Sequence, residues 1–458
     1  MSMQPQTSMN RRAFIKSASV SAGLVALPGI LKAQQAPSLN VVGANSRINV
    51  ACVGFSDRFT NALLPSFLKC KKELNFDMVA LADLWSRRRE EGKAKLEKDF
   101  GHSIDLYNSD DELYEKAKNV DAVIISTADF QHAMHTVHAV EAGKDSYTEK
   151  PLAEDMGSAN AVLDAVNKAR RNNNSGGAIV QVGSQRRSGN AYHIANDYIR
   201  SGKFGDISYV DLCWNVNQPR RWRRDEALVA SLKQKDTDWK KWLLDRPMVD
   251  FDPRKYLEFR LFWPYSSGIP GQWMCHQIDT VAWFTGFDFP RSAMAGGGIY
   301  AWQDGRQSCD TFTTIFEYGP ANDAKKGFQV VFSSRQTNSA RGNVENYHST
   351  IGTIDLIKGT VSNEGVEKAK KVEEKKLAET EVAATAANTG AGGMEIAHMH
   401  NWMECIRSRK QPNAPIEAGY SHAVALIMSN ASLRAGMKAT FDNVARQVMV
   451  GGKVFKGY

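Results

Sequence analysis

Short apolar runs alternate with helical stretches through the first third of this chain, and that order constrains the fold more than any other feature. The apolar runs have the length and composition of buried strands and lie at 48–53, 78–82 and 122–125. Stretches with helical character lie between and after them, at 87–100, 109–118 and 132–142. Strands that alternate with helices form a parallel sheet with right-handed crossovers. We therefore predict an α/β fold that begins with a Rossmann-like parallel sheet.

The residues that end these strands are placed for ligand binding. Gly54 follows the first strand, Asp83 the second, and Thr127 lies just beyond the third. The carboxyl ends of neighbouring parallel strands lie at one edge of the sheet, and ligands bind beyond that edge. The sequence therefore predicts a binding site at this edge.

The second half of the chain has a different pattern. Period-two alternation and short turns there are typical of a large, mostly antiparallel open sheet, with strands predicted at 207–215, 292–301, 311–318 and 327–334. Helices are predicted at 272–285, 401–409 and 420–437. We expect a dinucleotide-binding domain at 47–170 and a substrate-binding and oligomerisation α+β domain at 180–458. Within the second domain, 363–393 has almost no large apolar residue and is predicted to be an exposed, low-complexity excursion.

Charge and cysteine content exclude some classes of function. The chain has 458 residues and a formal net charge of +8, and residues 1–36 contribute four basic residues and no acid. The remaining +4 gives no reason to expect a nucleic-acid partner. The six cysteines include no C-x-x-C pair, so neither a zinc site nor a redox dithiol is indicated, and we predict no metal.

The turn after the first strand reads Gly-Phe-Ser-Asp-Arg-Phe at 54–59. In a Rossmann fold this turn carries G-x-G-x-x-G, whose glycines let the backbone approach a pyrophosphate and let the helix pack closely on the strand. Only Gly54 is present. Ser56 can still approach a phosphate and donate a hydroxyl, whereas Phe59 is too large for close packing. This motif alone leaves dinucleotide binding open.

Asp83 favours a dinucleotide. A carboxylate at the end of the second strand accepts hydrogen bonds from the adenosine ribose and repels a 2′-phosphate, so it favours NAD over NADP. The three arginines at 87–89 follow closely and offer charges for a 2′-phosphate. The alternative is that Asp83 only caps the next helix.

The N-terminus resembles the export signal read by the twin-arginine translocase. Arg11 and Arg12 are followed by Phe14 and Lys16, and then by an uncharged stretch of small and apolar residues at 17–31. That stretch is too short and too rich in small residues for a membrane span. The resemblance implies a 36-residue signal, an extracytoplasmic or periplasmic location, and a protein that folds, with any cofactor, before export. The alternative is a basic tail with a chance arginine pair.

A strand that ends in Glu-Lys-Pro-Leu at 149–152 resembles the Gfo/Idh/MocA oxidoreductases, the family of glucose–fructose oxidoreductase and inositol dehydrogenase. Four further stretches look like the same family in the same order: 127–132 (Thr-Ala-Asp-Phe-Gln-His), 183–188 (Gly-Ser-Gln-Arg-Arg-Ser), 275–279 (Cys-His-Gln-Ile-Asp) and 405–413. The resemblance runs from about residue 47 to the C-terminus. It implies tightly bound NAD, or else NADP, and a homo-oligomer.

The resemblance also implies the site residues. Lys150, His276 and Asp279 are the implied catalytic set, since a hydroxyl oxidation needs a base for the O–H proton while hydride leaves the carbon. His276 and Asp279 are three residues apart and share a helix face. The implied cofactor-binding residues are Gly54, Ser56, Asp57, Arg58, Asp83, Thr127, Asp129, His132, Glu149 and Lys150. Gln185 and Arg186 are implied substrate-binding residues. The family's aspartate–aromatic–glycine is replaced by Gln-Trp-Met at 272–274.

The stretch between 214 and 283 is rich in tryptophan, and a short segment within it is rich in arginine. Seven of the ten tryptophans lie between 214 and 283, and aromatic faces stack on the C–H faces of sugars. We predict that Trp263 and Trp273 line the substrate cleft, while most of the others are core or subunit contacts. The segment 219–224 carries four arginines. It is either a solvated or oligomer-facing loop, or a site for an acidic sugar.

The leading hypothesis is an exported NAD(P)-dependent oxidoreductase that acts on a carbohydrate hydroxyl. One alternative is a glycosidase that uses NAD for transient oxidation, elimination and re-reduction. Another is a non-catalytic sugar-binding or assembly protein on the same fold, which the residues Ser56, Phe59 and Gln272 motivate.

Overall fold

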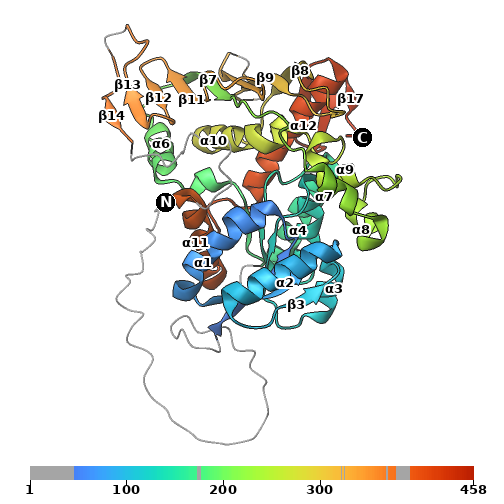
Figure 1. Cartoon of the computed structure of the whole chain (residues 1–458). Helices are drawn as coiled ribbons and strands as arrows, with labels where there is room; N and C mark the ends of the chain where they lie inside the picture. The colour runs from blue at the N-terminus through green and yellow to red at the C-terminus, as the bar shows by residue number, and fades with distance from the viewer. Residues whose placement is uncertain are drawn as a thin grey trace, which may run out of the picture. The chain divides into compact units, whose positions relative to one another are not determined.

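The computed structural model describes residues 46–172, 177–320, 322–323, 325–367, 370–377 and 392–457. Figure 1 shows their helices and strands along the chain. The predicted export signal at 1–36 lies outside these residues. Among the helices that the structure describes, none combines the length and the apolar character that a membrane crossing requires.

The first sheet consists of six parallel strands in the order β3-β2-β1-β4-β5-β6. These strands are β1 (Ile48–Val53), β2 (Phe76–Ala82), β3 (Asp105–Tyr107), β4 (Ala122–Ile125), β5 (Asp145–Thr148) and β6 (Val180–Val182). The helices that alternate with them are α1 (Leu64–Leu74), α2 (Ser86–Phe100), α3 (Asp110–Lys116), α4 (His132–Glu141) and α5 (Met156–Asn172). The predicted Rossmann-like parallel sheet is confirmed.

Both faces of this sheet are buried, which explains the continuous apolar runs in the sequence. Val50 and Cys52 of β1 pack in one core, with α1 and Trp402. Ala51 and Val53, which point to the opposite face, pack in a second core with Leu113 of α3. Strands that are covered on both sides select apolar residues at every position rather than at alternate ones.

The second sheet has eleven strands in the order β14-β13-β12-β11-β7-β10-β9-β8-β15-β16-β17. Its central strands are β7 (Ile207–Trp214), β8 (Ser292–Gly298), β9 (Thr311–Tyr318), β10 (Phe328–Arg335) and β11 (Asn343–Ser349). The shorter ones are β12 (Thr353–Asp355), β13 (Thr360–Ser362), β14 (Lys375–Lys376), β15 (Ala439–Asp442), β16 (Gln447–Val450) and β17 (Lys453–Val454). The pair β7–β10 is parallel and the other pairs are antiparallel. This confirms the predicted, mostly antiparallel sheet.

Helix α12 (Ile416–Ala435) connects the two sheets. It contacts β6 of the first sheet and β8 of the second, and α10 (Cys275–Thr285) packs beside it (Figure 1). Every residue of α12 from Ala418 to Ser432 is buried. A helix that is buried on all sides carries no polar face, so α12 belongs to the core rather than to the surface. Helix α6 (Asn190–Arg200) packs against α10 in turn.

Two elements of the predicted second domain belong to the layer of the first sheet. Strand β6 pairs with β5, and α11 (Gly393–Ser408) packs against α1 (Figure 1). Trp402 of α11 is fully buried in the same core as Phe67 of α1. The boundary near residue 180 therefore does not separate the two layers. Local sequence patterns do not predict which strand pairs at a sheet edge or where a distant helix packs, because both depend on tertiary contacts.

The predicted excursion at 363–393 is in part packed onto the fold. Strand β14 pairs with β13, and Val372 and Leu377 are buried in the main core. Two apolar side chains in a polar segment were enough to attach it to the sheet. Residues 368–369 and 378–391 of the excursion lie outside the described residues.

Phe59 occupies the place where a Rossmann fold usually has its third glycine. Its side chain is fully buried, with its ring centroid 5.8 Å from that of Phe55. The helix begins with a π-helical turn at Phe59–Leu63 before α1, a wider turn that is found often at functional sites. The large side chain predicted to hinder packing is thus accommodated as part of the core.

We expect Phe59→Ala to destabilise the protein by about 3–5 kcal/mol, because it leaves a cavity under the turn. Phe59→Leu, which keeps most of the volume, is expected to cost less than about 1.5 kcal/mol. Chemical unfolding of both variants measures the difference. Equal losses of stability in the two variants would show that the aromatic shape of the side chain, and not the volume that it fills, controls stability at this position.

Candidate active site

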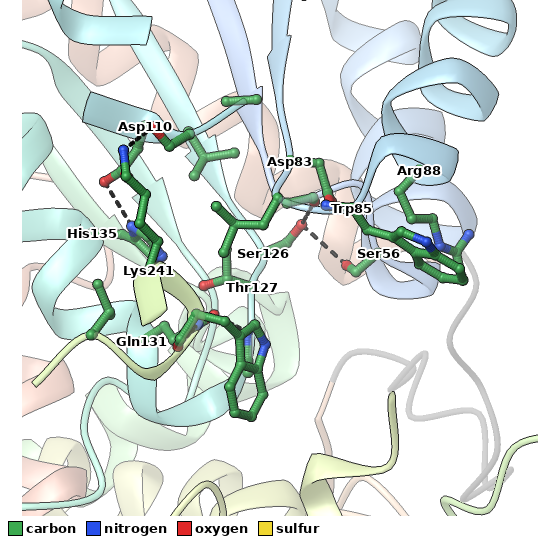
Figure 2. A pocket seen from close by; sticks show the side chains of 18 of the residues that line it. Ser56, Asp83, Trp85, Arg88, Asp110, Ser126, Thr127, Gln131, His135 and Lys241 are labelled. Carbon is green, nitrogen blue, oxygen red and sulfur yellow. Dashed lines mark hydrogen bonds and ion pairs between the residues drawn. The ribbon is translucent and has the colours of Figure 1, made fainter. Parts of the chain in front are cut away.

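A cavity of about 650 Å³ lies beyond the carboxyl ends of β1, β2 and β4. This volume is within the range of small-molecule and cofactor sites. Figure 2 shows its walls, with Ser56, Ser126 and Thr127 at the strand ends and Trp85 and Arg88 on one side. Six of the predicted cofactor-binding residues line it: Gly54, Ser56, Asp57, Arg58, Asp83 and Thr127.

A segment from the second half of the chain closes the cavity. It contains the short helices α7 (Glu226–Ser231), α8 (Trp239–Leu243) and α9 (Pro253–Leu257). Trp242 of α8 and Tyr256 of α9 line the cavity, and their ring centroids are 5.3 Å apart. Gln131 at the start of α4 donates from Nε2 to the carbonyl of Trp242, at 2.6 Å. The cavity therefore has a polar edge formed by the first sheet and an aromatic cover.

The turn at Gly54 leaves space that only glycine allows. Gly54 has φ +87°, and a Cβ atom there would lie 2.7 Å from Cγ2 of Thr127. The hydroxyl of Ser126 donates to the carbonyl of Gly54 at 2.8 Å, and the hydroxyl of Ser56 lies 3.2 Å from that of Ser126 (Figure 2). Oγ of Ser56 also accepts from the N–H of Phe59 at 3.2 Å. Ser56 therefore caps the helix, a role that the second glycine of the motif lacks.

Asp83 is buried at the end of β2, where its carboxylate holds two loops. It accepts from the N–H of Phe55 at 2.8 Å and from the N–H of Trp85 at 2.8 Å. Burial raises the pKa of Asp83, while these two N–H groups oppose the shift. Each carboxylate oxygen has a second lone pair, so Asp83 retains the capacity to accept from a ligand. The helix-capping alternative accounts for only one of the two bonds.

Asp57 lies between two guanidinium groups at the cavity. Its carboxylate is paired with Arg88, at 3.0 Å, and with Arg224. Burial acts to raise the pKa of Asp57, but the charges of Arg224 and Arg88 lower it overall. The pair with Arg224 connects the glycine turn to the segment that covers the cavity.

At the far end of the cavity, two histidines share one carboxylate oxygen. Oδ2 of Asp110 lies 2.7 Å from Nδ1 of His135 and 2.8 Å from Nδ1 of His138, and Figure 2 shows Asp110, His135 and Lys241 together. The three groups are of metal-ligand type, with ligand atoms within 4.8 Å of one another. Sequence reasoning missed this cluster. The signal was the H-x-x-H spacing on α4, which puts both rings on one helix face.

Lys150 and His276 do not line this cavity, and they come from different parts of the chain. Nζ of Lys150 donates to the carbonyl of Gln272 at 2.7 Å and reaches that of Gly271 at 3.4 Å. His276, on the first turn of α10, is partly exposed beside Trp214, with ring centroids 5.9 Å apart. Burial lowers the pKa of His276 far below its usual value, and the charge of Lys150 lowers it further. His276 is therefore neutral at pH 7.

Asp279 does not face the same space as His276. Its side chain is fully buried, and its carboxylate accepts from Nε of Arg187 at 2.8 and 3.1 Å. Nδ1 of His422 on α12 lies 4.0 Å away. Burial lowers the pKa of His422 to about 3, so this ring is neutral as well. The shared helix face predicted from the spacing is present, but the carboxylate is enclosed by α12 and Arg187.

The remaining predicted cofactor residues are joined in buried networks. Arg58 pairs with Glu149 at 2.9 Å. Oδ2 of Asp129 accepts from Nε2 of Gln272 at 2.6 Å, and Nδ1 of His132 lies 2.8 Å from the carbonyl of Pro151. Polar atoms that are buried without a partner remain in this region, among them Thr127 Oγ1, Asp129 Oδ1 and His132 Nε2.

The predicted substrate-binding residues lie in different environments. Gln185 is buried and reaches the hydroxyl of Tyr147 at 3.4 Å, and Arg186 is buried and paired with Glu345 at 2.8 Å. Trp273 stacks on Trp214, with ring centroids 6.1 Å apart and an angle of 10°.

Trp263 packs against Arg434, near the end of α12, with the guanidinium 4.4 Å from the ring. The aromatic neighbours of Trp273 are Trp214 and Trp222. The lining of a substrate cleft by Trp263 and Trp273 stays a prediction.

The sheet order and the cavity at the strand ends define a Rossmann-like fold. Residues 48–174 match the model of the Gfo/Idh/MocA family, described as an oxidoreductase family with an NAD-binding Rossmann fold. Over this part, which is less than half of its length, the chain is similar to the Rossmann fold of that oxidoreductase family.

Inositol 2-dehydrogenases are among the sequence relatives. That of Salmonella paratyphi B is 26% identical over 197 residues, which are 42% of this chain and 52% of the relative. The chain thus matches about half the length of this relative.

Two solved structures share the fold over most of the chain. Levoglucosan dehydrogenase in complex with NADH and L-sorbose is 17% identical, with 86% of this chain and 98% of that one covered and a TM-score of 0.62. The WlbA dehydrogenase from Bordetella pertussis, in complex with NADH and UDP-GlcNAcA, is 15% identical, with 86% and 99% covered and a TM-score of 0.59. At these identities the likeness concerns the fold.

The cluster around Asp110 makes stability depend on pH. Burial acts to raise the pKa of Asp110, but His135 and His138 hold it well below its usual value, and the bond to Asp110 raises the pKa of His138. The contribution of His138 is complete below about pH 6.5 and is lost as the pH rises through its raised pKa. That of Asp110 is complete above about pH 4 and is lost as the pH falls through its lowered pKa.

We therefore expect Asp110→Asn to destabilise the protein by about 2 kcal/mol near pH 6, with a smaller loss near pH 9. Urea unfolding at both values measures this. Glu115→Gln is the matched control, because Glu115 is exposed on the same helix α3. A loss for Asp110→Asn that does not change with pH would contradict the charged pair.

Proposed function

We propose that this protein is an NAD-dependent oxidoreductase that acts on a hydroxyl of a sugar or sugar derivative, with Lys150 and His276 as the acid–base pair. One observation carries the proposal: Lys150, just after β5, is hydrogen-bonded to the carbonyls of Gln272 and Gly271, in the turn that leads into α10 and its partly exposed His276. The family model of residues 48–174 and the inositol 2-dehydrogenase relatives support the same class of reaction.

The residues around the cavity fit a dinucleotide. Gly54 leaves room for a phosphate where a Cβ would collide with Thr127, and Asp83 is placed for a ribose. Oγ1 of Thr127 is buried without a partner. The first N–H groups of the helix that starts at Asp57 provide further donors for an anion. When bound there, NAD supplies the hydride acceptor, or NADH the donor.

His276 is the proposed base. Oxidation of a hydroxyl breaks the O–H and C–H bonds, and the proton goes to the neutral ring of His276 while hydride leaves the carbon. The ammonium of Lys150, oriented by the carbonyls of Gln272 and Gly271, donates a hydrogen bond to the substrate oxygen. We propose that Asp279, held by Arg187, positions α10 and does not touch the substrate.

Replacement of Lys150 by Met or of His276 by Gln is expected to lower the rate of sugar oxidation by about 10²–10⁴-fold. NAD bound to the same preparations, measured by mass spectrometry of the denatured protein, should be unchanged. Lys453→Met is the control, since this lysine is exposed on β17.

The same assays test the alternatives. Full activity in both site variants would place the chemistry elsewhere. Release of an aryl leaving group from a glycoside without net NADH would favour the glycosidase. Failure to bind either NAD or NADP would leave a binding protein.

NAD is favoured over NADP because the arginines after Asp83 are already engaged. Arg87 pairs with Glu91 at 2.7 Å, Arg88 with Asp57, and Arg89 donates to the carbonyl of Asp83. A 2′-phosphate would have to displace these contacts and would face the carboxylate of Asp83.

We expect Asp83→Asn to weaken NAD binding by about 10–100-fold, because a charged acceptor for the ribose is lost, and to weaken NADP binding less. Fluorescence titration of both nucleotides measures the ratio. Asp105→Asn on β3 is the control. An unchanged ratio of the NAD and NADP affinities would show that Asp83 only holds the two loops together and does not bind the ribose.

We further propose, from the N-terminal arginine pair, that the folded protein is exported by the twin-arginine route to the periplasm and retains NAD tightly. We also propose that it forms a homo-oligomer through the second sheet. Cell fractionation with and without Arg11→Lys and Arg12→Lys tests the route.

A further inference from the structure

The four arginines of the 219–224 segment are not equivalent. Arg220 is largely exposed, with Glu226 3.5 Å away. Arg223 pairs with the buried Glu258 at 2.9 Å, and Arg224 pairs with Asp57. Among the residues that the structure describes, no carboxylate lies within ion-pair distance of Arg221. The loop therefore contains three paired arginines and one whose charge has no counter-ion.

Arg221 is held in place by its backbone and by aromatic rings. Its N–H donates to the carbonyl of Gln218 at 3.0 Å, and its carbonyl accepts from Arg306 at 3.2 Å. Its guanidinium lies 5.9 Å from the ring centroid of Trp222 and 5.7 Å from that of Trp273. Its Nε atom is buried without a hydrogen-bond partner.

A second cation increases the unbalanced charge. Arg260 is mostly buried, donates from Nε to Oε1 of Gln272 at 2.9 Å, and has Asp129 only at 3.9 Å. Burial lowers the pKa of Arg221 to about 10, and the positive charge of Arg260 adds to this shift. Two desolvated cations that repel each other destabilise the free protein. Such an arrangement is stabilised when an anion binds between them.

Arg260 and Arg221 are each linked to the proposed reaction centre. Gln272 links Arg260 to it, since its side chain accepts from Arg260 and its carbonyl from Lys150. Trp273, under Arg221, stacks on Trp214, and Trp214 adjoins His276. Arg221 does not line the cavity beyond β1, β2 and β4, whereas Arg260 lines it. An anion at Arg221 would therefore lie beside that cavity rather than within it, where the substrate is expected.

We propose that the substrate is an acidic sugar, whose oxyanion group, a carboxylate or a phosphate, binds Arg221 and Arg260 while its ring stacks on the tryptophans around Trp273. Arginine forms bidentate hydrogen bonds with both groups, and Trp faces suit sugar C–H groups. This inference rests on the proposed function for the reaction at the hydroxyl, but the binding itself can be measured without turnover.

The test is calorimetric binding of D-glucuronate, D-glucose 6-phosphate and D-glucose to the protein as purified. We expect at least one acid to bind about 30–100-fold more tightly than glucose, the range for a charge-assisted bidentate contact. In Arg221→Met this preference should disappear while NAD affinity is unchanged. In Arg221→Lys, which keeps the charge without the planar guanidinium, the preference for the acid should be intermediate. Arg220→Met should show the same preference as the wild type.

Thermal unfolding distinguishes a binding role from a structural one. Because the charge of Arg221 is unpaired, Arg221→Met should keep or raise the melting temperature of the ligand-free protein, whereas loss of a structural arginine lowers it. A lowered melting temperature, equal binding of glucose and the acids, no binding of any of the three at millimolar concentration, or equal weakening of NAD and acid binding would each overturn the proposal.

The two proposals can fail separately. Acid binding that depends on Arg221, without oxidation of any sugar, would refute the oxidoreductase and retain the acidic ligand. Oxidation of neutral sugars at rates that Arg221→Met does not change would retain the oxidoreductase and refute the acidic substrate.

Discussion

The burial of α12 between the two sheets is the contact on which the rest of the structure depends. From Ala418 to Ser432 this helix has no exposed residue, and it contacts β6, β8 and α10. His422 at its centre shows the consequence for the site: Nε2 accepts from the N–H of Leu152, just after Lys150, at 3.3 Å, and Nδ1 faces Asp279 at 4.0 Å. One buried helix thus fixes the strand end with the lysine and the helix with the histidine.

Removal from water and ion pairing then determine which arginines of the cleft remain available to bind a ligand. Arg186 and Arg187 are buried and Arg58 is half-buried, but each has a carboxylate at hydrogen-bond distance. A paired buried charge stabilises a position and leaves little capacity for a ligand. Arg221 and Arg260 are desolvated without that compensation. This contrast distinguishes the paired arginines, which stabilise the cleft, from Arg221 and Arg260, which are proposed to bind a ligand in it.

The altered glycine turn shows how a familiar site tolerates substitution. The fold needs a close approach of backbone at Gly54, where a side chain would collide with Thr127. It does not need the other two glycines, because Ser56 turns inward as a helix cap and Phe59 enters the core through a π-helical turn. Gly54, where the backbone is proposed to approach a phosphate, is therefore kept. At the position where the helix packs on the strand, Phe59 replaces the usual glycine.

The sequence by itself determined the two kinds of sheet and the position of Gly54, Asp83 and Thr127 at one sheet edge, because apolar periodicity and strand ends are local properties. Through family motifs it also predicts Lys150 and His276 as the acid–base pair. Only the tertiary structure decided which side chains meet. It enclosed Asp279, set Trp214 beside Trp273, and left Arg221 without a counter-ion among the described residues. Pairing and desolvation depend on segments far apart in the chain, and no local pattern records them.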